Sequence, residues 1–253
     1  MIKYGLKLWT TNSPGLAKAS KKLLEEKAVD FLELYIHPGS QGISHFNILK
    51  GMEISIHATH FDHGFNLSAL DNEAVKFFKE EVIRAADFFG SHHIILHPGA
   101  SCDSRAFLDN FEKIRDPRIL IENMPKFSLD GQVFFGYSLE ELIWIRDNTG
   151  SDFCLDLGHA IASAFAQKIG YKEYVSNLLL ALDPHYFHIG GKKYDSNIDE
   201  HLNLWEGTYD LAWVKSLIQK KAEEKDSRLV FEIKREGLAL ENELKNVEYF
   251  KSF

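Results

Sequence analysis

The stretch RILIE, residues 118–122, is a short apolar run that ends in an ionisable side chain, and similar runs recur along the chain. Runs rich in Ile, Leu, Val and Phe are typical of strands that are buried on both faces of a parallel sheet. The other runs that predict strands are Lys3–Trp9, Phe31–Ile36, Glu53–His57, His93–His97, Phe153–Asp156, Tyr186–Ile189 and Arg228–Ile233.

Amphipathic segments separate these runs. Asn72–Phe89 has the clearest pattern, with apolar residues at helical spacing. Ser138 and Glu141 form a capping-box pattern, which predicts a helix over Ser138–Asn148. The alternation of strands and helices predicts a parallel α/β fold. The remaining expected helices are Gly15–Glu26, Tyr171–Ala181, Asp210–Glu223 and Glu241–Phe250, with a shorter one near Ile43–Lys50.

The number of strand candidates indicates which α/β fold to expect. Eight units of roughly 32 residues match the size of a (β/α)8 TIM barrel. A doubly wound open sheet is the runner-up, but the chain has no GxGxxG or Walker A sequence to favour its nucleotide-binding version. No Pro-, Gly- or Ser-rich linker divides the chain, so we expect a single domain over residues 1–253.

The composition disfavours several classes of protein. Lys plus Arg is 29 and Asp plus Glu is 37, and this formal net charge of −8 lowers the odds of nucleic-acid binding. No apolar run approaches the roughly 18–20 residues that span a bilayer, and the N-terminus lacks a signal-peptide pattern. The two cysteines, Cys102 and Cys154, cannot make a disulfide framework, so we expect a reduced, cytoplasmic protein.

Ionisable residues occur near the C-terminal end of six consecutive strand candidates. In a TIM barrel these ends form the active-site mouth, so the side chains should meet there. Buried ionisable groups are costly unless they are paired or bind a metal, and a bound cation accounts for a ring of them. Any one of these residues, taken alone, could instead cap a helix or be a hydrogen-bonded residue of the core. The six residues are His57, His97, Glu122, Asp156, His188 and Glu232.

Two further groups extend this set and bear on the metal. His159 lies one step into the loop after Asp156, and Asp199 and His201 have a spacing that allows both to bind one ion. Imidazole and carboxylate ligands without thiolate suit Zn²⁺, Mn²⁺, Fe²⁺ or Co²⁺, whereas Ca²⁺ prefers oxygen ligands alone. We therefore predict a divalent-metal cofactor, zinc or manganese, with one to three ions.

Several segments, in order along the chain, resemble the xylose isomerase-like barrel superfamily, which contains endonuclease IV and the sugar isomerases and epimerases. These segments are His57-Ala58, Asn66-Leu67, His97-Pro98-Gly99, Ile121-Glu122-Asn123, Cys154–Ala160, His188, Asp199-Glu200-His201, Glu206-Gly207 and Phe231-Glu232. The resemblance to endonuclease IV implies three zinc ions, with Glu122 bridging two of them. The nine implied ligands are His57, His97, Glu122, Asp156, His159, His188, Asp199, His201 and Glu232.

The resemblance to the epimerase branch implies a different use of the same residues. One divalent ion would be held by Glu122, Asp156, His188 and Glu232, and the two glutamates would transfer a proton next to a metal-polarised carbonyl. The expected function is a metal-dependent isomerase or epimerase of a sugar or sugar phosphate. One alternative is an endonuclease IV-like zinc phosphodiesterase acting at abasic sites in DNA. Another is a barrel that binds a sugar without converting it.

Departures from the endonuclease IV pattern favour carbohydrate chemistry. Met124-Pro125-Lys126-Phe127 stands where that family has a glycine-rich loop, and Gly190-Gly191 stands where an Asn-Asp pair is common. Gly5-Leu6-Lys7-Leu8-Trp9 and Glu33-Leu34-Tyr35 look like the sugar-isomerase branch. We therefore expect a small-molecule carbohydrate, free or phosphorylated, rather than DNA as the partner, and no membrane association. Many barrels of this kind self-associate, so a homo-oligomer is open, but the sequence does not specify the oligomeric state.

Five residues are candidates for substrate contacts. The loops after strands seven and eight of such barrels often bind phosphate, and here they carry Lys192 and Lys234, with solvated surface residues as the alternative. Charge reversal at both lysines is expected to raise KM for a phosphosugar more than for the unphosphorylated sugar. Trp9 could stack on a sugar ring or pack in the core. The last two candidates are His60 and Asn66.

Overall fold

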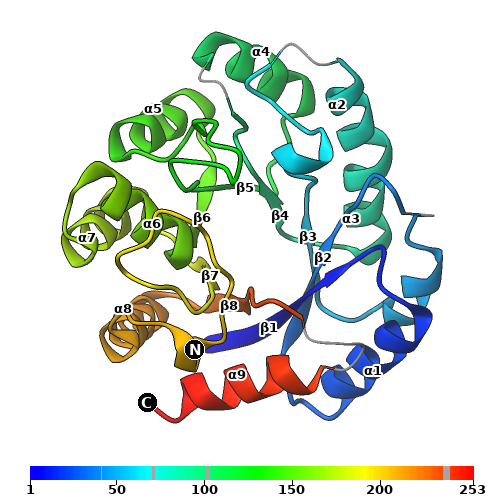
Figure 1. The fold of residues 1–253 in the computed structure, drawn as a ribbon. Coiled ribbons are helices and arrows are strands. Elements are labelled where there is room, and N and C mark those ends of the chain that lie inside the picture. Colours follow the sequence, from blue (N-terminus) through cyan, green and yellow to red (C-terminus); the bar gives the residue numbers. More distant parts are fainter. Residues whose placement is uncertain (41, 70–71, 101–102, 236–239) are drawn as a thin grey trace.

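Parallel strands pair in chain order around a closed barrel, and β8 pairs with β1 to complete it (Figure 1). The computed structural model describes residues 1–40, 42–69, 72–100, 103–235 and 240–253, and these contain the complete barrel. The predicted TIM barrel is therefore confirmed. The eight strands are β1 (Ile2–Trp9), β2 (Phe31–Tyr35), β3 (Ile54–His57), β4 (Ile94–Leu96), β5 (Ile119–Glu122), β6 (Asp152–Asp156), β7 (Tyr186–Ile189) and β8 (Ser227–Phe231).

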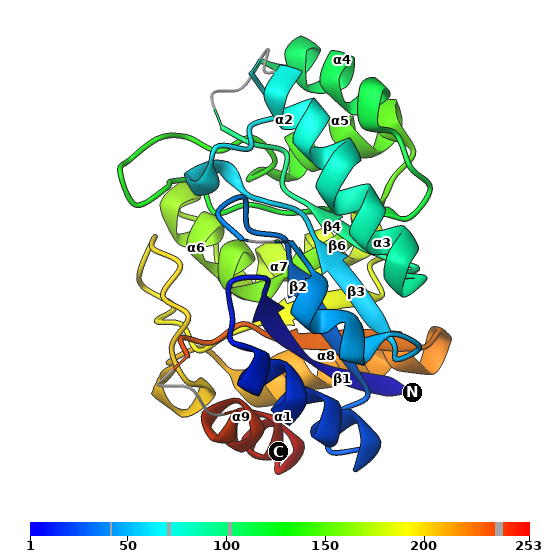
Figure 2. The same cartoon turned by 90° about the vertical axis from the view of Figure 1, so that its right-hand side faces the viewer.

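Helices surround the strands on the outside of the barrel, as Figures 1 and 2 show. No helix in the described ranges is both long and apolar enough to cross a membrane. Short 3-10 turns cover Ser44–Leu49, Phe61–His63 and Leu204–Glu206, and a π-helical segment, Phe78–Ile83, joins α2 to α3. The α-helices are α1 (Pro14–Glu25), α2 (Asn72–Phe77), α3 (Arg84–Phe89), α4 (Ser104–Ile114), α5 (Leu139–Thr149), α6 (Leu157–Gln167), α7 (Tyr171–Leu182), α8 (Leu211–Glu224) and α9 (Glu241–Lys251).

Two helices were not predicted from the sequence. Every residue of α6 from Leu157 to Ala164 is buried, so the helix has no polar face that would reveal its period. His159 consequently lies in the first turn of α6 and not in a loop. The other helix, α4, does carry a recognisable signal, because Asp103 caps its N-terminus and its apolar residues recur at helical spacing.

Side chains alternate between the inside and the outside of the barrel along each strand. One buried cluster fills the barrel interior and consists of Phe31, Ile95, Leu120, Cys154, Tyr186 and Val230. Gly5 makes room for this cluster, since a Cβ atom at Gly5 would lie 2.5 Å from the Phe31 ring. The residue two positions after each member of this cluster points to the same face, and in all six cases it is ionisable. These six residues are Glu33, His97, Glu122, Asp156, His188 and Glu232. The interior apolar layer therefore closes the barrel beneath a polar layer.

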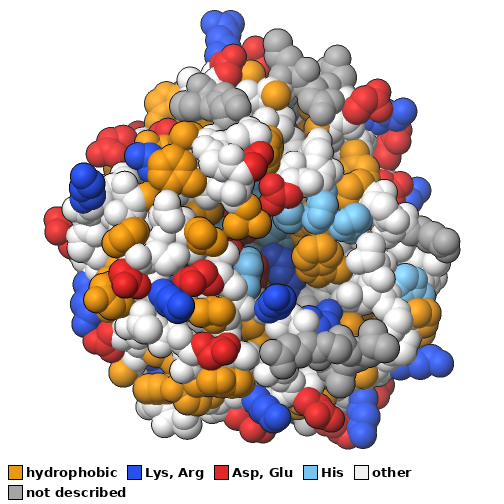
Figure 3. Space-filling model, viewed as in Figure 1, with side chains coloured by type: hydrophobic (Ala, Val, Ile, Leu, Met, Phe, Trp, Pro, Cys, Tyr) orange, Lys and Arg blue, Asp and Glu red, His pale blue; other side chains and the backbone are white. Residues whose placement is uncertain are grey.

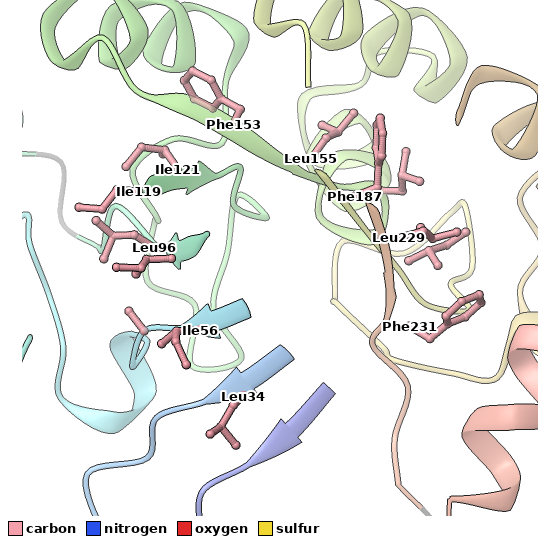
Figure 4. Packing of buried hydrophobic residues seen from close by; sticks show 14 of the residues in the cluster. Leu34, Ile56, Leu96, Ile119, Ile121, Phe153, Leu155, Phe187, Leu229 and Phe231 are labelled. Carbon is pink, nitrogen blue, oxygen red and sulfur yellow. The ribbon is translucent and has the colours of Figure 1, made fainter. Parts of the chain in front are cut away.

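The outward side chains of the strands form the main core between the barrel and its helices. Figure 4 shows part of this layer, which includes Leu34, Ile56, Leu96 and Leu155. Each such side chain stabilises the fold by roughly 1.5–3 kcal/mol relative to leaving it in water. This layer fixes the strands, and so fixes the polar side chains that they direct inward. Cys154 is a buried free thiol, and Cys102 lies outside the described residues.

A histidine at the N-terminal end of β4 should make stability depend on pH. Burial first, and then Arg228, lower the pKa of His93 to about 4. The folded protein therefore keeps His93 neutral while the unfolded chain takes up a proton, so stability is lost as the pH falls from about 6.5 to 4. We expect His93→Gln to reduce the fall in Tm between pH 7 and pH 4.5 relative to wild type. Calorimetric melts in which His93→Gln and wild type lose the same Tm over this range would contradict this.

Candidate active site

A pocket of about 500 Å³ opens at the C-terminal ends of the strands. Figure 3 shows this face of the molecule hollowed near its centre, with histidine and cationic side chains around the hollow. Trp9 and His60, two of the predicted substrate contacts, line the pocket. The acidic, basic and histidine residues that line it are Lys7, His60, Asp62, His97, His159, Asp199, Glu200, His201, Glu232, Lys234, Arg235 and Glu243.

Glu122, at the end of β5, lies at the centre of the polar layer and is 1% exposed. Its Oε2 lies 3.1 Å from His57 Nε2 and 2.9 Å from His97 Nε2. Its Oε1 lies 3.2 Å from His188 Nδ1 and 3.4 Å from His159 Nδ1. One oxygen of the Glu122 carboxylate thus faces one pair of imidazoles and the other oxygen faces a second pair. This arrangement would let Glu122 contribute a ligand atom to each of two neighbouring ion sites.

Backbone carbonyls fix which ring nitrogen of three histidines carries a proton. His57 Nδ1 donates to the Ala58 carbonyl at 2.7 Å, and His159 Nδ1 donates to the Asn123 carbonyl at 2.8 Å. His201 Nδ1 donates to the Glu232 carbonyl at 3.1 Å. The Nε2 atoms of all three rings then point at carboxylates.

A neutral imidazole with a protonated Nδ1 presents a lone pair at Nε2, and a carboxylate presents lone pairs as well. The two atoms need a proton or a cation between them. An Nδ1–H bonded to a carbonyl, with Nε2 free, is the arrangement that orients histidine as a metal ligand. The donor set of this site therefore fits a divalent cation.

The nine predicted metal ligands come together in the pocket and directly beneath it. Asp199 Oδ2 lies 3.3 Å from His159 Nε2 and 2.6 Å from His201 Nε2, so the loop after β7 reaches the strand ends. Within the described residues, two sets made only of predicted ligands have ligand atoms that all lie within 4.8 Å of one another. These sets are His57, His97 and Glu122, and Glu122, Asp156, His188 and Glu232.

The electrostatics keep the two glutamates of the site ionised. Burial would raise the pKa of Glu122, but His188 and His97 lower it well below its usual value. Lys7 and His188 do the same for the pKa of Glu232. Asp156 differs, since burial raises its pKa to about 6 and the neighbouring Asp199 adds to the effect while His159 opposes it.

Glu33 and Lys7 contact the predicted ligands directly, but neither was predicted from the sequence. Glu33 on β2 is fully buried and accepts hydrogen bonds from Tyr186 Oη at 2.8 Å and His188 Nε2 at 2.9 Å. Lys7 on β1 forms an ion pair with Glu232 and lies 3.6 Å from Glu33. Both lie within their strands rather than at the strand ends, where the sequence analysis looked. The alternation of inward side chains is the signal that could have found them.

Two of the predicted substrate contacts do not face the pocket. Lys192 is 1% exposed and its ammonium donates to the carbonyls of Ser196 and Ile198, so it holds the loop after β7 and has no freedom to bind phosphate. Asn66 donates to the Ala100 carbonyl and accepts from the Ala100 amide, which ties two loops together. Lys234, by contrast, lines the pocket.

One wall of the pocket is apolar. Most of it is built from the segment after β5, in which Phe127 and Val133 pair as an antiparallel bridge, and Phe61 packs against Phe134 of this segment. Leu129, near the turn of this segment, is 84% exposed although it is a large apolar residue. The apolar residues of this wall are Phe61, Met124, Pro125, Phe127, Leu129 and Phe134.

Comparisons of the whole chain with solved structures find the same fold. The chain resembles endonuclease IV from Thermus thermophilus, with a TM-score of 0.72, 18% identity, and 99% and 98% of the two chains covered. It resembles 3-keto-D-glucoside 4-epimerase from E. coli, with a TM-score of 0.68, 12% identity and all of both chains covered. A xylose isomerase domain protein from Alicyclobacillus acidocaldarius has a TM-score of 0.59, 13% identity, and 100% and 96% covered.

At these identities the three likenesses establish the fold and nothing further. No curated protein sequence matches the chain. A match at the level of the family does exist, and it covers residues 47–252 under the description "Xylose isomerase-like TIM barrel". Because that match spans most of the chain and the barrel is closed as the family requires, the protein belongs to the xylose isomerase-like TIM barrel family.

Proposed function

We propose that this protein is a divalent-metal-dependent isomerase or epimerase of a carbohydrate, in which Glu122 and Glu232 transfer the proton. The observation that carries the proposal is the placement of these two carboxylates. Glu122 Oε1 lies 3.2 Å and Glu232 Oε1 lies 2.7 Å from the same atom, His188 Nδ1. Two ionised carboxylates from different strands therefore lie beside one imidazole, with ligand atoms within 4.8 Å of each other, and this supports roles in removing and returning a proton.

The residues that would hold the ion are Glu122, Asp156, His188 and Glu232, whose ligand atoms lie within 4.8 Å of one another. A divalent ion held there would polarise the carbonyl and the adjacent hydroxyl of a sugar and so acidify the C–H bond of the carbon that carries the hydroxyl. One of the two glutamates removes that proton and the other returns one to the neighbouring carbon or to the other face.

The pocket supports a substrate larger than a free sugar. Ligand pockets of about 300–1,000 Å³ usually enclose most of their ligand, and about 500 Å³ is available here. The lining combines ionisable side chains with large apolar side chains such as Phe127 and Leu129. A sugar with an apolar substituent matches both kinds of lining residue. The E. coli protein of similar fold is described as acting on a 3-keto-glucoside, which is a substituted sugar.

The second candidate is a zinc phosphodiesterase of the endonuclease IV type. The contacts of Asp199 with His159 and His201 favour it, because these residues would complete a set of nine ligands. The apolar wall and the net charge of −8 disfavour a DNA duplex as the substrate. A barrel that only binds a sugar is disfavoured by the two ionised glutamates, since binding alone does not require both.

The test is turnover in D₂O of a panel of ketoses, aldoses and keto-glycosides, with the protein loaded with Mn²⁺ or Zn²⁺. We expect one substrate class to isomerise and to gain deuterium at the carbon next to the carbonyl, detected by NMR. A duplex with one abasic site is assayed in parallel under the same loading. Cleavage of the duplex without any sugar turnover would replace the proposal with the phosphodiesterase.

Of the two lysines predicted to bind phosphate, Lys234 lines the pocket, whereas the Lys192 ammonium donates to backbone carbonyls. We expect Lys234→Glu to raise KM for a phosphorylated sugar about tenfold, the equivalent of ~1.4 kcal/mol of binding energy, and to change KM for the unphosphorylated sugar less than about twofold. Lys193→Glu, an exposed neighbour of the buried Lys192, is the matched control. Steady-state kinetics measure KM for both sugars. Equal changes in KM for the phosphorylated and the unphosphorylated sugar would exclude a phosphate contact at Lys234.

A further inference from the structure

A lysine lies inside the proposed metal centre. Lys7 is on β1, two residues after Gly5 on the same inward face, and its side chain is 13% exposed. Its ammonium forms an ion pair with Glu232 Oε1 and lies 3.6 Å from Glu33 Oε1. Burial alone would lower the pKa of Lys7, but Glu232 and Glu33 together raise it, so the side chain is a cation.

The two carboxylates that Lys7 contacts belong to one set of potential metal ligands. Glu33, His57, His188 and Glu232 have ligand atoms that all lie within 4.8 Å of one another, which is the size of a cation site. A divalent ion in this set would share both carboxylates with the ammonium. The two positive charges would then repel each other at short range inside the barrel, where water screens charge poorly.

This set shares His57, His188 and Glu232 with the ligand sets built on Glu122 and differs from them by Glu33. Glu122 Oε2 lies within 3.1 Å of His57 and His97, and no ion pair joins Lys7 to Glu122 or Asp156 in the described part of the chain. The contacts of Glu232 with Lys7 and His188 both use Oε1. The other oxygen of Glu232 is therefore free of these two partners.

We propose that the Lys7 ammonium is a built-in cation that takes the place of a divalent ion at the set Glu33, His57, His188 and Glu232, and so restricts ion binding to the ligands around Glu122. The inference rests on the proposed function, because it assumes that the site binds a metal. With Lys7 in place, the protein would bind fewer ions than its ligand sets could hold if all of them were filled. Lys7 would also hold Glu232 in place for proton transfer when only the ligands around Glu122 carry an ion.

The test counts bound ions and does not use activity. Wild type, Lys7→Met and Lys7→Arg are stripped with a chelator and titrated with Mn²⁺ and with Zn²⁺ by calorimetry, and the bound metal is counted by plasma mass spectrometry. Lys7→Met is expected to bind one more ion per chain than wild type, and Lys7→Arg, which keeps the charge, is expected to bind the wild-type number. Lys3→Met is the matched control, because Lys3 lies on the same strand and pairs with Glu53 at 2.6 Å away from the site.

The same count for Lys7→Met and wild type, with the same affinity, would overturn the proposal. If Lys7→Met does not fold, crystals of the wild-type protein soaked in Mn²⁺ decide the matter by anomalous scattering. Peaks at Glu122 with none at Glu33 are expected, and an ion bound to Glu33 in the wild type would refute the proposal. Absence of sugar turnover by a metal-loaded wild type would remove the proposed function but would leave these counts interpretable, so the two failures are distinguishable.

Discussion

Glu122→Gln is expected to lower kcat/KM for the sugar substrate about a thousandfold, within the range of roughly 10²–10⁴ that a positioned base contributes. The substitution keeps the shape of the side chain but removes its charge. Glu122 faces His57 and His97 with one oxygen and His188 with the other, so both ligand sets that it joins lose their shared carboxylate. The affinity for Mn²⁺ or Zn²⁺ should fall along with the activity.

Steady-state kinetics with saturating metal, together with metal analysis of the purified variant, check this expectation. Glu25→Gln provides the control, since Glu25 is an exposed glutamate on α1 that pairs only with Lys21 at 3.6 Å among its described ion pairs. A Glu122→Gln variant that keeps both its metal and its activity would exclude Glu122 from the metal centre and from proton transfer.

The largest expected effect on stability is at Glu33. Removal of one member of a buried ionic network typically costs about 3–5 kcal/mol, because its partners stay buried without compensation. Glu33 is fully buried and is contacted by Lys7, Tyr186 and His188. We therefore expect Glu33→Ala to lower the free energy of unfolding of the metal-free protein by about 3–5 kcal/mol, which corresponds to roughly 6–20 °C in Tm at this chain length.

Calorimetric unfolding of the chelated protein measures this loss. Glu33→Gln preserves a hydrogen-bond acceptor for Tyr186 and should be less damaging than Glu33→Ala. Glu25→Ala, at the surface, should change Tm very little. If Glu33→Ala unfolded within about 2 °C of wild type, the contacts of Glu33 would add nothing to stability, and the network around Lys7 would need another explanation.

The sequence predicted much of the fold and of the candidate site from local patterns. RILIE at residues 118–122 is representative, since alternation places Leu120 and Glu122 on the same face of the strand. The structure has Leu120 in the apolar cluster inside the barrel and Glu122 in the polar layer. The same alternation, applied to Gly5, Lys7 and Trp9 or to Phe31, Glu33 and Tyr35, would have revealed the two missed residues.

Other features could not be predicted from local patterns. Helix α6 is buried on all sides between Leu157 and Ala164, so the sequence lacks the periodicity that marks a surface helix. Asn66 was expected to contact substrate, but its side chain is used by Ala100, which lies 34 residues away in sequence. Lys192 was expected to bind phosphate, but its ammonium is buried by a loop whose path the sequence does not specify.

By itself, the sequence determined the alternation of strands and helices, the closed barrel as the expected fold, and the set of imidazoles and carboxylates near the strand ends. These are local properties, because a strand directs every second side chain to the same face. Only the tertiary structure decided which carboxylate faces which imidazole and which carboxylates a lysine neutralises. Lys7 and Glu232 are 225 residues apart and meet because β1 pairs with β8 when the barrel closes. Contacts of that kind depend on the register between distant strands, which no local pattern encodes.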